Sequence, residues 1–243
     1  MELMTLNDFL NNTNLLPWLV PVGPLLAFFI ITLITNRAKM VPAASSEYND
    51  HNHPAYPGLN VPVVSVPGRV TSIIVGLVGI LSAWAIAYSI VGPALGTEGF
   101  GEEVVFGSSV PWLALGDTSF NMGVLVDPLT TIMLIMVPLA CTMIFIYSIG
   151  YMAHDPRQAR FFALISLFAG AMLTLVVADN LLLLFVGWEI MGLCSYLLIG
   201  FWFEKESAYK AAIKAFTTTR VADVIMLLGI AYLYAATGTL SFR

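Results

Sequence analysis

The chain has 243 residues, of which 58% are hydrophobic and 10% are charged, and its formal net charge at pH 7 is −5. This composition excludes an ordinary water-soluble domain, in which about 25% of the residues are charged. The ten Lys and Arg residues are scattered and form no basic patch, which argues against a nucleic-acid partner.

Apolar runs divide the chain into six predicted transmembrane helices, each near the roughly 20 residues that a spanning helix needs. We therefore predict an all-α polytopic membrane protein that forms a single membrane domain over residues 1–243. No small-residue cleavage site follows the first span, so we treat that span as a retained helix. The predicted spans are 15–35, 70–92, 128–149, 161–178, 181–203 and 210–236.

Two helix starts are marked by proline. In the first span, LLPWLVPVGPLL contains Pro17, Pro21 and Pro24, which preclude a regular start, so we expect a regular helix only from about Pro24. The third span opens with Asp127 and Pro128, an N-cap acceptor followed by a residue suited to the first helical position.

Basic residues alternate along the connections and predict the topology. Lys and Arg occur in three connections, 36–69, 150–160 and 204–210, and are absent from the N-terminal tail, the 93–127 loop and the tight turn at 178–180. Under the positive-inside rule, 36–69 is an inner loop, 93–127 is an outer loop, and both termini lie on the outer side.

The two long loops carry further signals. The Pro-rich 36–69 loop lacks helical periodicity, and its role stays open; its His51 and His53 have no third ligand in view, so we interpret them as solvated residues rather than a metal site. The 93–127 loop alternates glycine with short β-prone runs, and we expect a small β-hairpin there.

Cys141 and Cys194 lie inside apolar runs and have neither disulfide nor iron–sulfur spacing. We interpret them as small buried apolar side chains, and redox chemistry is expected in other chains.

The fifth span contains one carboxylate, Glu189, about 12 Å from the start of the helix at the usual rise per residue. Helical steps of three and four residues place it on one stripe with Gly192, Tyr196 and Gly200. Because small residues let a neighbouring helix approach, we expect this face to pack on protein or on a small water-filled space. No residue of its own helix can pair with Glu189, so it needs a partner elsewhere or must be protonated.

The sixth span contains four charges. Lys210 lies near the inner boundary, where it can anchor the helix, and Lys214 lies one turn deeper on the same stripe. Arg220 and Asp223 lie on the other side of the helix near mid-membrane. Two interpretations stay open: this pair neutralises itself and holds the bundle together, or it takes part in transport.

A buried carboxyl group beside a movable cation can pump protons. Desolvation favours the protonated form, whereas an approaching cation favours release of the proton. The chain has no nucleotide-binding glycine loop and no cofactor motif, so the energy must come from partner subunits or from an ion gradient.

Four segments together resemble one protein family: LVDPLTTIMLIM, GYMAHDPRQARFFALISLF, ADNLLLLFVGWEIMGLCSYLLIGFWF and KAAIKAFTTTRVADVIMLLG. The family is that of the antiporter-like membrane subunit L (chain 5) of NADH:quinone oxidoreductase, respiratory complex I. The resemblance runs from about residue 122 to residue 243.

The resemblance implies a proton channel in which Glu189 transfers protons and Lys214, Arg220 and Asp223 form a supporting charge network. It implies no cofactor in this chain; flavin, iron–sulfur clusters and quinone are expected in partner subunits. The expected partners are other complex I membrane subunits, chiefly the neighbouring antiporter-like subunit. The expected location is an energy-transducing membrane, the plasma membrane of a bacterium.

Family members contain two inverted helix repeats, of which six helices cover only the N-terminal part. We therefore expect a truncated product, a split subunit or part of a longer chain, in which the family's lysine partner of Glu189, on the seventh helix, is missing. Two alternatives to proton translocation stay open: a structural or assembly subunit without its own complete channel, and a subunit of Na⁺/H⁺ antiporter type.

Overall fold

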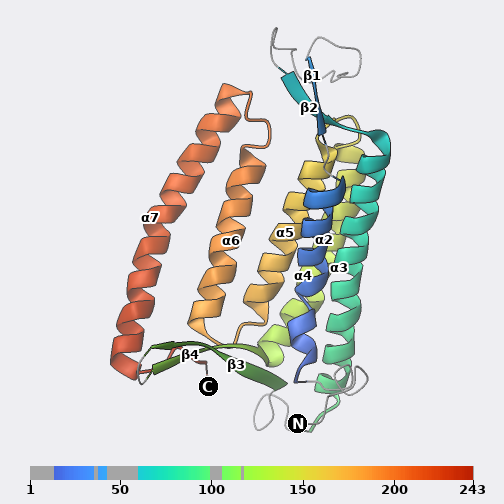
Figure 1. Cartoon of the computed structure of the whole chain (residues 1–243). Helices are drawn as coiled ribbons and strands as arrows, with labels where there is room; N and C mark the ends of the chain where they lie inside the picture. Colours follow the sequence, from blue (N-terminus) through green and yellow to red (C-terminus); the bar gives the residue numbers. More distant parts are fainter. Residues whose placement is uncertain (1–13, 36–37, 43–59, 99–105, 116–117, 243) are drawn as a thin grey trace.

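The computed structural model of the chain describes residues 14–35, 38–42, 60–98, 106–115 and 118–242 (Figure 1). Among these residues, six helical segments are long and apolar enough to cross a membrane, which confirms the predicted polytopic helical fold class. The outward orientation of both termini stays a prediction. His51 and His53 lie outside the described residues.

Three short segments make up the first span, η1 (Leu16–Leu19), α2 (Val22–Ile30) and the π-helical turn η2 (Ile31–Thr35). The other spans are α3 (Val66–Leu95), α4 (Pro128–Tyr151), α5 (Gln158–Val176), α6 (Leu181–Ile199) and α7 (Glu206–Thr237). Two antiparallel hairpins join β1 (Ala38–Pro42) to β2 (Asn60–Val64) and β3 (Phe106–Leu115) to β4 (Thr118–Val126).

The predicted irregular entry of the first span is confirmed, but the regular helix begins at Val22, two residues before Pro24. Pro24 fits there because the first four N–H groups of a helix have no intrahelical acceptor, so the missing N–H costs nothing. At the other end of the span, Thr35 Oγ1 lies 3.1 Å from the Ile31 carbonyl and 2.8 Å from Ser72 Oγ on α3.

Side-chain caps begin two of the later helices. Asp127 accepts a hydrogen bond from the Thr130 N–H at 2.7 Å, which confirms the predicted N-cap of α4. Asn180 accepts one from the Leu183 N–H at 2.8 Å at the start of α6. The predicted tight turn between α5 and α6 is also confirmed, because only four residues separate these helices.

Several helix boundaries differ from the sequence-based expectation, among them those of α3, which begins at Val66 rather than 70 and ends at Leu95 rather than 92. Helix α5 begins at Gln158 rather than 161, because the Asp155 carboxylate accepts the Arg157 N–H at 2.7 Å and turns the chain into the helix. Helix α6 ends at Ile199 rather than 203, since the aromatic residues after it form a turn. Helix α7 begins at Glu206 rather than 210, so Lys210 lies inside it, 2.6 Å from Glu206.

Helix α5 occupies the centre of the arrangement and packs against α2, α3, α4 and α6. Helix α7 packs mainly against α6 and stands at the edge of the molecule (Figure 1). In the main core, the Phe145 and Phe162 rings are fully buried with their centroids 5.7 Å apart. Helices α6 and α7 therefore form a pair at the edge of the well-packed bundle of the other helices, and α6 joins this pair to α5.

The β3–β4 hairpin lies across one end of the helices, within the loop where the sequence suggested a hairpin, and the β1–β2 hairpin lies at the other end (Figure 1). Trp18 donates its indole N–H to Ser108 Oγ at 2.8 Å, which ties the first span to β3. The Leu125 N–H donates to the Val177 carbonyl at 2.9 Å, which ties β4 to the α5–α6 turn.

Candidate functional site

The glycine-containing face of α6 packs on α7, which confirms the predicted contact of this face with protein and identifies the helix that makes it. A Cβ atom added at Gly192 would collide with Nη2 of Arg220, and one added at Gly200 would lie 3.1 Å from the Ala212 Cβ. The Tyr196 ring lies between them along α6, with its centroid 4.9 Å from that of Phe216 on α7. The absence of side chains at the two glycines allows this close approach.

Glu189 faces a cation from the same chain. Its Oε2 forms an ion pair with Nη1 of Arg220 on α7, and the two side chains are 28% and 27% exposed. Nη2 of the same guanidinium lies 3.1 Å from Oδ2 of Asp223. One arginine is therefore shared between two carboxylates that come from different helices.

Trp188 completes this arrangement and was not among the residues predicted from the sequence. Its indole N–H donates to Oδ1 of Asp223 at 2.9 Å, and the Asp223 side chain is only 8% exposed. The available signal was the indole itself, since a tryptophan N–H within a membrane span needs an acceptor. We call Trp188, Glu189, Arg220 and Asp223 the α6–α7 cluster.

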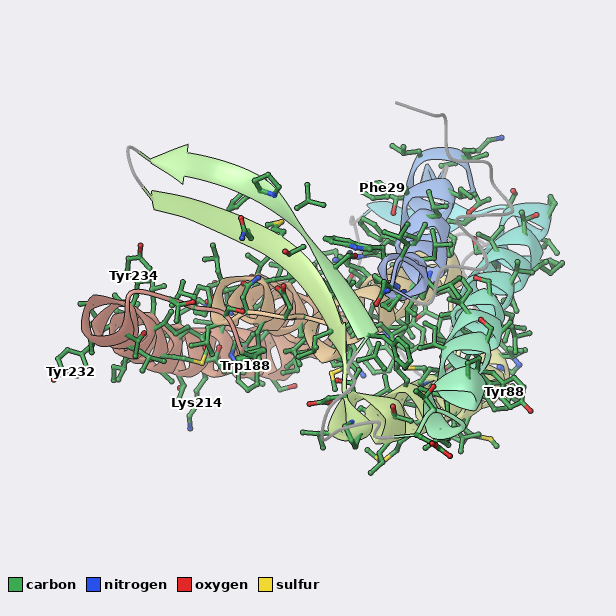
Figure 2. All side chains as sticks on the ribbon, turned by 90° about the horizontal axis from the view of Figure 1, so that it is seen from below. Phe29, Tyr88, Trp188, Lys214, Tyr232 and Tyr234 are labelled. Carbon is green, nitrogen blue, oxygen red and sulfur yellow. The ribbon has the colours of Figure 1, made fainter. Side chains whose placement is uncertain are left out.

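Lys214 does not belong to this cluster in the structure. Its side chain is exposed and points outward from α7 (Figure 2), and no ion pair involves it among the residues that the structure describes. It lies six positions before Arg220, which places the two side chains about 120° apart around the helix. Its part in a charge network stays a prediction.

A cavity of about 390 Å³ lies between α6 and α7 beside the cluster. Most of its lining is apolar, and Asp223 and Ser195 contribute polar side chains. Within the described part of the chain, three buried atoms of the cluster make no hydrogen bond: Nε and Nη2 of Arg220 and Oδ2 of Asp223. The contact between Nη2 and Oδ2 is thus a charge contact without hydrogen-bond geometry, and the pair retains unused hydrogen-bonding capacity.

The position of the shared arginine decides which of the two carboxylates has a counter-charge. If the arginine moves toward one carboxylate, the other loses its counter-charge and gains affinity for a proton.

The described residues contain no group of three His, Cys, Asp or Glu side chains placed to hold a metal ion. Cys141 and Cys194 are both buried and free.

A second charged cluster joins the α4–α5 turn to the α6–α7 turn. Nη1 of Arg157 lies 2.5 Å from Oε1 of Glu204, and Arg157 is only 3% exposed. Trp202 donates its indole N–H to Oδ2 of Asp155 at 2.9 Å, and the Phe201 ring centroid lies 5.3 Å from the Arg157 guanidinium carbon. We call Asp155, Arg157, Trp202 and Glu204 the turn cluster.

The turn cluster corrects one sequence-based expectation. Arg157 was counted among the loop charges that face the inner membrane surface, yet it is buried and paired within the protein. Arg160 is partly exposed, with its guanidinium carbon 5.9 Å from the Phe201 ring centroid. The aromatic residues that follow α6 form a turn that covers Arg157. A count of loop charges does not reveal this burial.

Two family descriptions match parts of the chain between residues 112 and 243. Residues 178–243 match the family of NADH:quinone oxidoreductase and Mrp antiporter transmembrane segments, and residues 112–162 match the N-terminus of chain 5 of complex I. The first match contains the whole α6–α7 cluster.

Curated relatives agree with this assignment. The chain is 45% identical over 137 residues to NAD(P)H-quinone oxidoreductase chain 5 of Synechocystis, and 48% identical over 134 residues to NADH-quinone oxidoreductase subunit L of Rickettsia felis. It is also 48% identical over 157 residues to F(420)H(2) dehydrogenase subunit L of Methanosarcina mazei.

The three alignments cover 56%, 55% and 65% of this chain but only 20%, 21% and 22% of the respective relatives. The matched segment is therefore about a fifth of each relative. The two family matches and these relatives together confirm the resemblance of this chain to the antiporter-like subunit L (chain 5) of NADH:quinone oxidoreductase.

Proposed function

We propose that the chain is a proton-translocating part of the membrane arm of an NADH:quinone oxidoreductase, with Glu189 as the proton-transfer residue. The observation that carries the proposal is the ion pair between Glu189 and Arg220, which links α6 to α7 far from either end of both helices. Arg220 and Asp223 adjust the proton affinity of Glu189, and Lys214 supplies a further charge on the outer face of α7.

The family description, which groups NADH:quinone oxidoreductase with Mrp antiporters, supports a role in ion movement rather than in electron transfer. Two of the relatives are named for quinone reduction by NADH or NAD(P)H, and one is named as an F(420)H(2) dehydrogenase. A membrane segment common to enzymes with different reductants serves a step that these enzymes share. We therefore assign flavin, iron–sulfur and quinone chemistry to partner subunits of the complex and none to this chain.

The remaining assignments follow from the same proposal. The partners are other membrane subunits of the complex, chiefly the neighbouring antiporter-like subunit. The chain would act as one subunit of a translocating enzyme, in an energy-transducing membrane such as the bacterial plasma membrane.

The test is Glu189→Gln in membrane vesicles that carry the assembled complex. Gln keeps the shape of the side chain but cannot exchange a proton, so proton uptake during NADH oxidation should fall roughly tenfold, while NADH oxidation largely continues. Dye quenching reports proton uptake, and NADH absorbance reports electron transfer.

Unchanged proton uptake in Glu189→Gln would contradict the proposal and favour a structural or assembly role. Deleting the chain would then remove neighbouring subunits from the complex, whereas Glu189→Gln would have no effect. Proton uptake that depends on external Na⁺ would instead indicate a subunit of antiporter type.

A further inference from the structure

The guanidinium of Arg220 occupies a position that α6 leaves open. Its Nη2 lies over Gly192, where any Cβ atom would collide with it, and its guanidinium carbon lies 4.9 Å from the Phe216 ring centroid. The aromatic ring and the glycine therefore limit where the guanidinium can be. From this position it reaches Glu189 and Asp223 together.

Asp223 is held in turn by α6. The indole N–H of Trp188 donates to one carboxylate oxygen at 2.9 Å, and the other oxygen lies 3.1 Å from Arg220 without a hydrogen bond. Trp188 and Glu189 are consecutive residues, so one turn of α6 contacts both Asp223 and its arginine. Rotation or displacement of α6 would change both contacts at once.

We propose that Trp188 and Gly192 are positioning residues, which together fix how the Arg220 guanidinium is shared between Glu189 and Asp223. Trp188 holds Asp223 with its N–H, and Gly192 provides the space that Nη2 occupies. The inference rests on the proposed proton-transfer role of the cluster and adds the two groups that set its geometry.

Gly192→Ala tests whether the space at Gly192 positions the Arg220 guanidinium. The added methyl group displaces the end of the Arg220 side chain, because the colliding atom is the tip of a flexible chain and not backbone. We expect proton uptake per NADH oxidised to fall roughly tenfold in the assembled complex, as small misplacements of reacting groups can have large effects. Gly229→Ala, on α7, is the matched control, since a Cβ there would meet nothing within 4 Å.

Two substitutions of Trp188 test the hydrogen bond. Trp188→Phe keeps an aromatic ring but loses the donor, whereas Trp188→Gln loses the ring but keeps an N–H. We expect Phe to lower proton uptake roughly fivefold and Gln to lower it less, because a hydrogen bond to a charged group is worth more than a neutral one. A role in packing alone would give the opposite order. Trp202→Phe is the control, because it removes another indole–aspartate bond of the same 2.9 Å length.

The outcomes separate the inference from the proposed function. Loss of proton uptake in Glu189→Gln with unchanged uptake in Gly192→Ala, or with Phe tolerated better than Gln at position 188, would overturn the inference alone. Unchanged uptake in Glu189→Gln would overturn the proposed function itself. If Gly192→Ala prevents assembly, judged on a native gel, the order of the two Trp188 variants decides.

Discussion

The two charged clusters use the same chemical groups in different settings. Each contains an arginine between two carboxylates and an indole that donates to an aspartate at 2.9 Å. In the turn cluster the arginine is 3% exposed, whereas in the α6–α7 cluster it is 27% exposed. A cavity adjoins the α6–α7 cluster.

This difference in burial indicates that the two clusters serve different functions. The guanidinium of Arg157 lies within 5.5 Å of the Phe201 and Phe203 ring centroids, and its Nη1 is hydrogen-bonded to Glu204, so displacement would break several contacts. Arg220 has two buried donor nitrogens without a hydrogen bond, against one in Arg157, and a cavity adjoins it. The turn cluster is suited to hold two helix hairpins together, and the α6–α7 cluster is suited to rearrange.

The largest expected effect on stability comes from Arg157→Met. It leaves Glu204 and Asp155 partly or fully buried without their cation, which destabilises a protein by about 3 kcal/mol or more. We expect little assembled complex in membranes, measured on a native gel with NADH oxidation stained in place.

A double variant separates charge from packing. Arg157→Met combined with Glu204→Leu removes one of the two uncompensated carboxylates, and the other, Asp155, keeps its hydrogen bonds from Trp202 and from the backbone N–H of residue 157. Assembly should recover in part, because apolar replacements of a buried ion pair are often tolerated. A double variant no better than the single one would mean that the turn cluster acts through the shape of the arginine rather than through its charge.

Arg220→Gln should have a smaller effect on stability and a large effect on transport. Its partner Glu189 is about a quarter exposed, and the more buried Asp223 keeps the Trp188 N–H, so the free energy of unfolding should fall by about 2 kcal/mol, less than in Arg157→Met, and assembly should persist. Proton uptake should fall roughly tenfold, because Glu189 and Asp223 lose the cation that they share. Loss of assembly as severe as in Arg157→Met would make the two clusters equivalent and remove the proposed distinction.

Part of this arrangement could be predicted from the sequence. Apolar runs located six helices, and helical angles placed Glu189 on a glycine face and Arg220 with Asp223 on one side of α7. These inferences need only the length of a span and the period of a helix. The partner of Glu189 was not predicted, because the angle at which α7 turns toward α6 depends on packing between residues about 30 positions apart.

The turn cluster could not be predicted for a related reason. Phe201, Trp202 and Phe203 continue the apolar run of α6, so hydropathy extends the helix through them. In the structure they form a turn that covers Arg157, which lies more than 40 residues earlier in the chain. Charge counts treat such an arginine as a loop residue, since they do not detect tertiary burial.

The smallest expected effects form a pair that tests the comparison directly. Glu204→Gln replaces a carboxylate that is 18% exposed, but Arg157 keeps Asp155 3.7 Å away, so the free energy of unfolding should fall by only about 1 kcal/mol. Glu189→Gln should lower it by less, because its pair is more exposed. The order for transport should be reversed, with proton uptake nearly normal in Glu204→Gln and lost in Glu189→Gln. Thermal unfolding of the detergent-solubilised complex compares the two variants in stability, and proton uptake in vesicles compares them in transport. If the same variant had the larger effect in both measurements, one cluster would serve stability and transport alike.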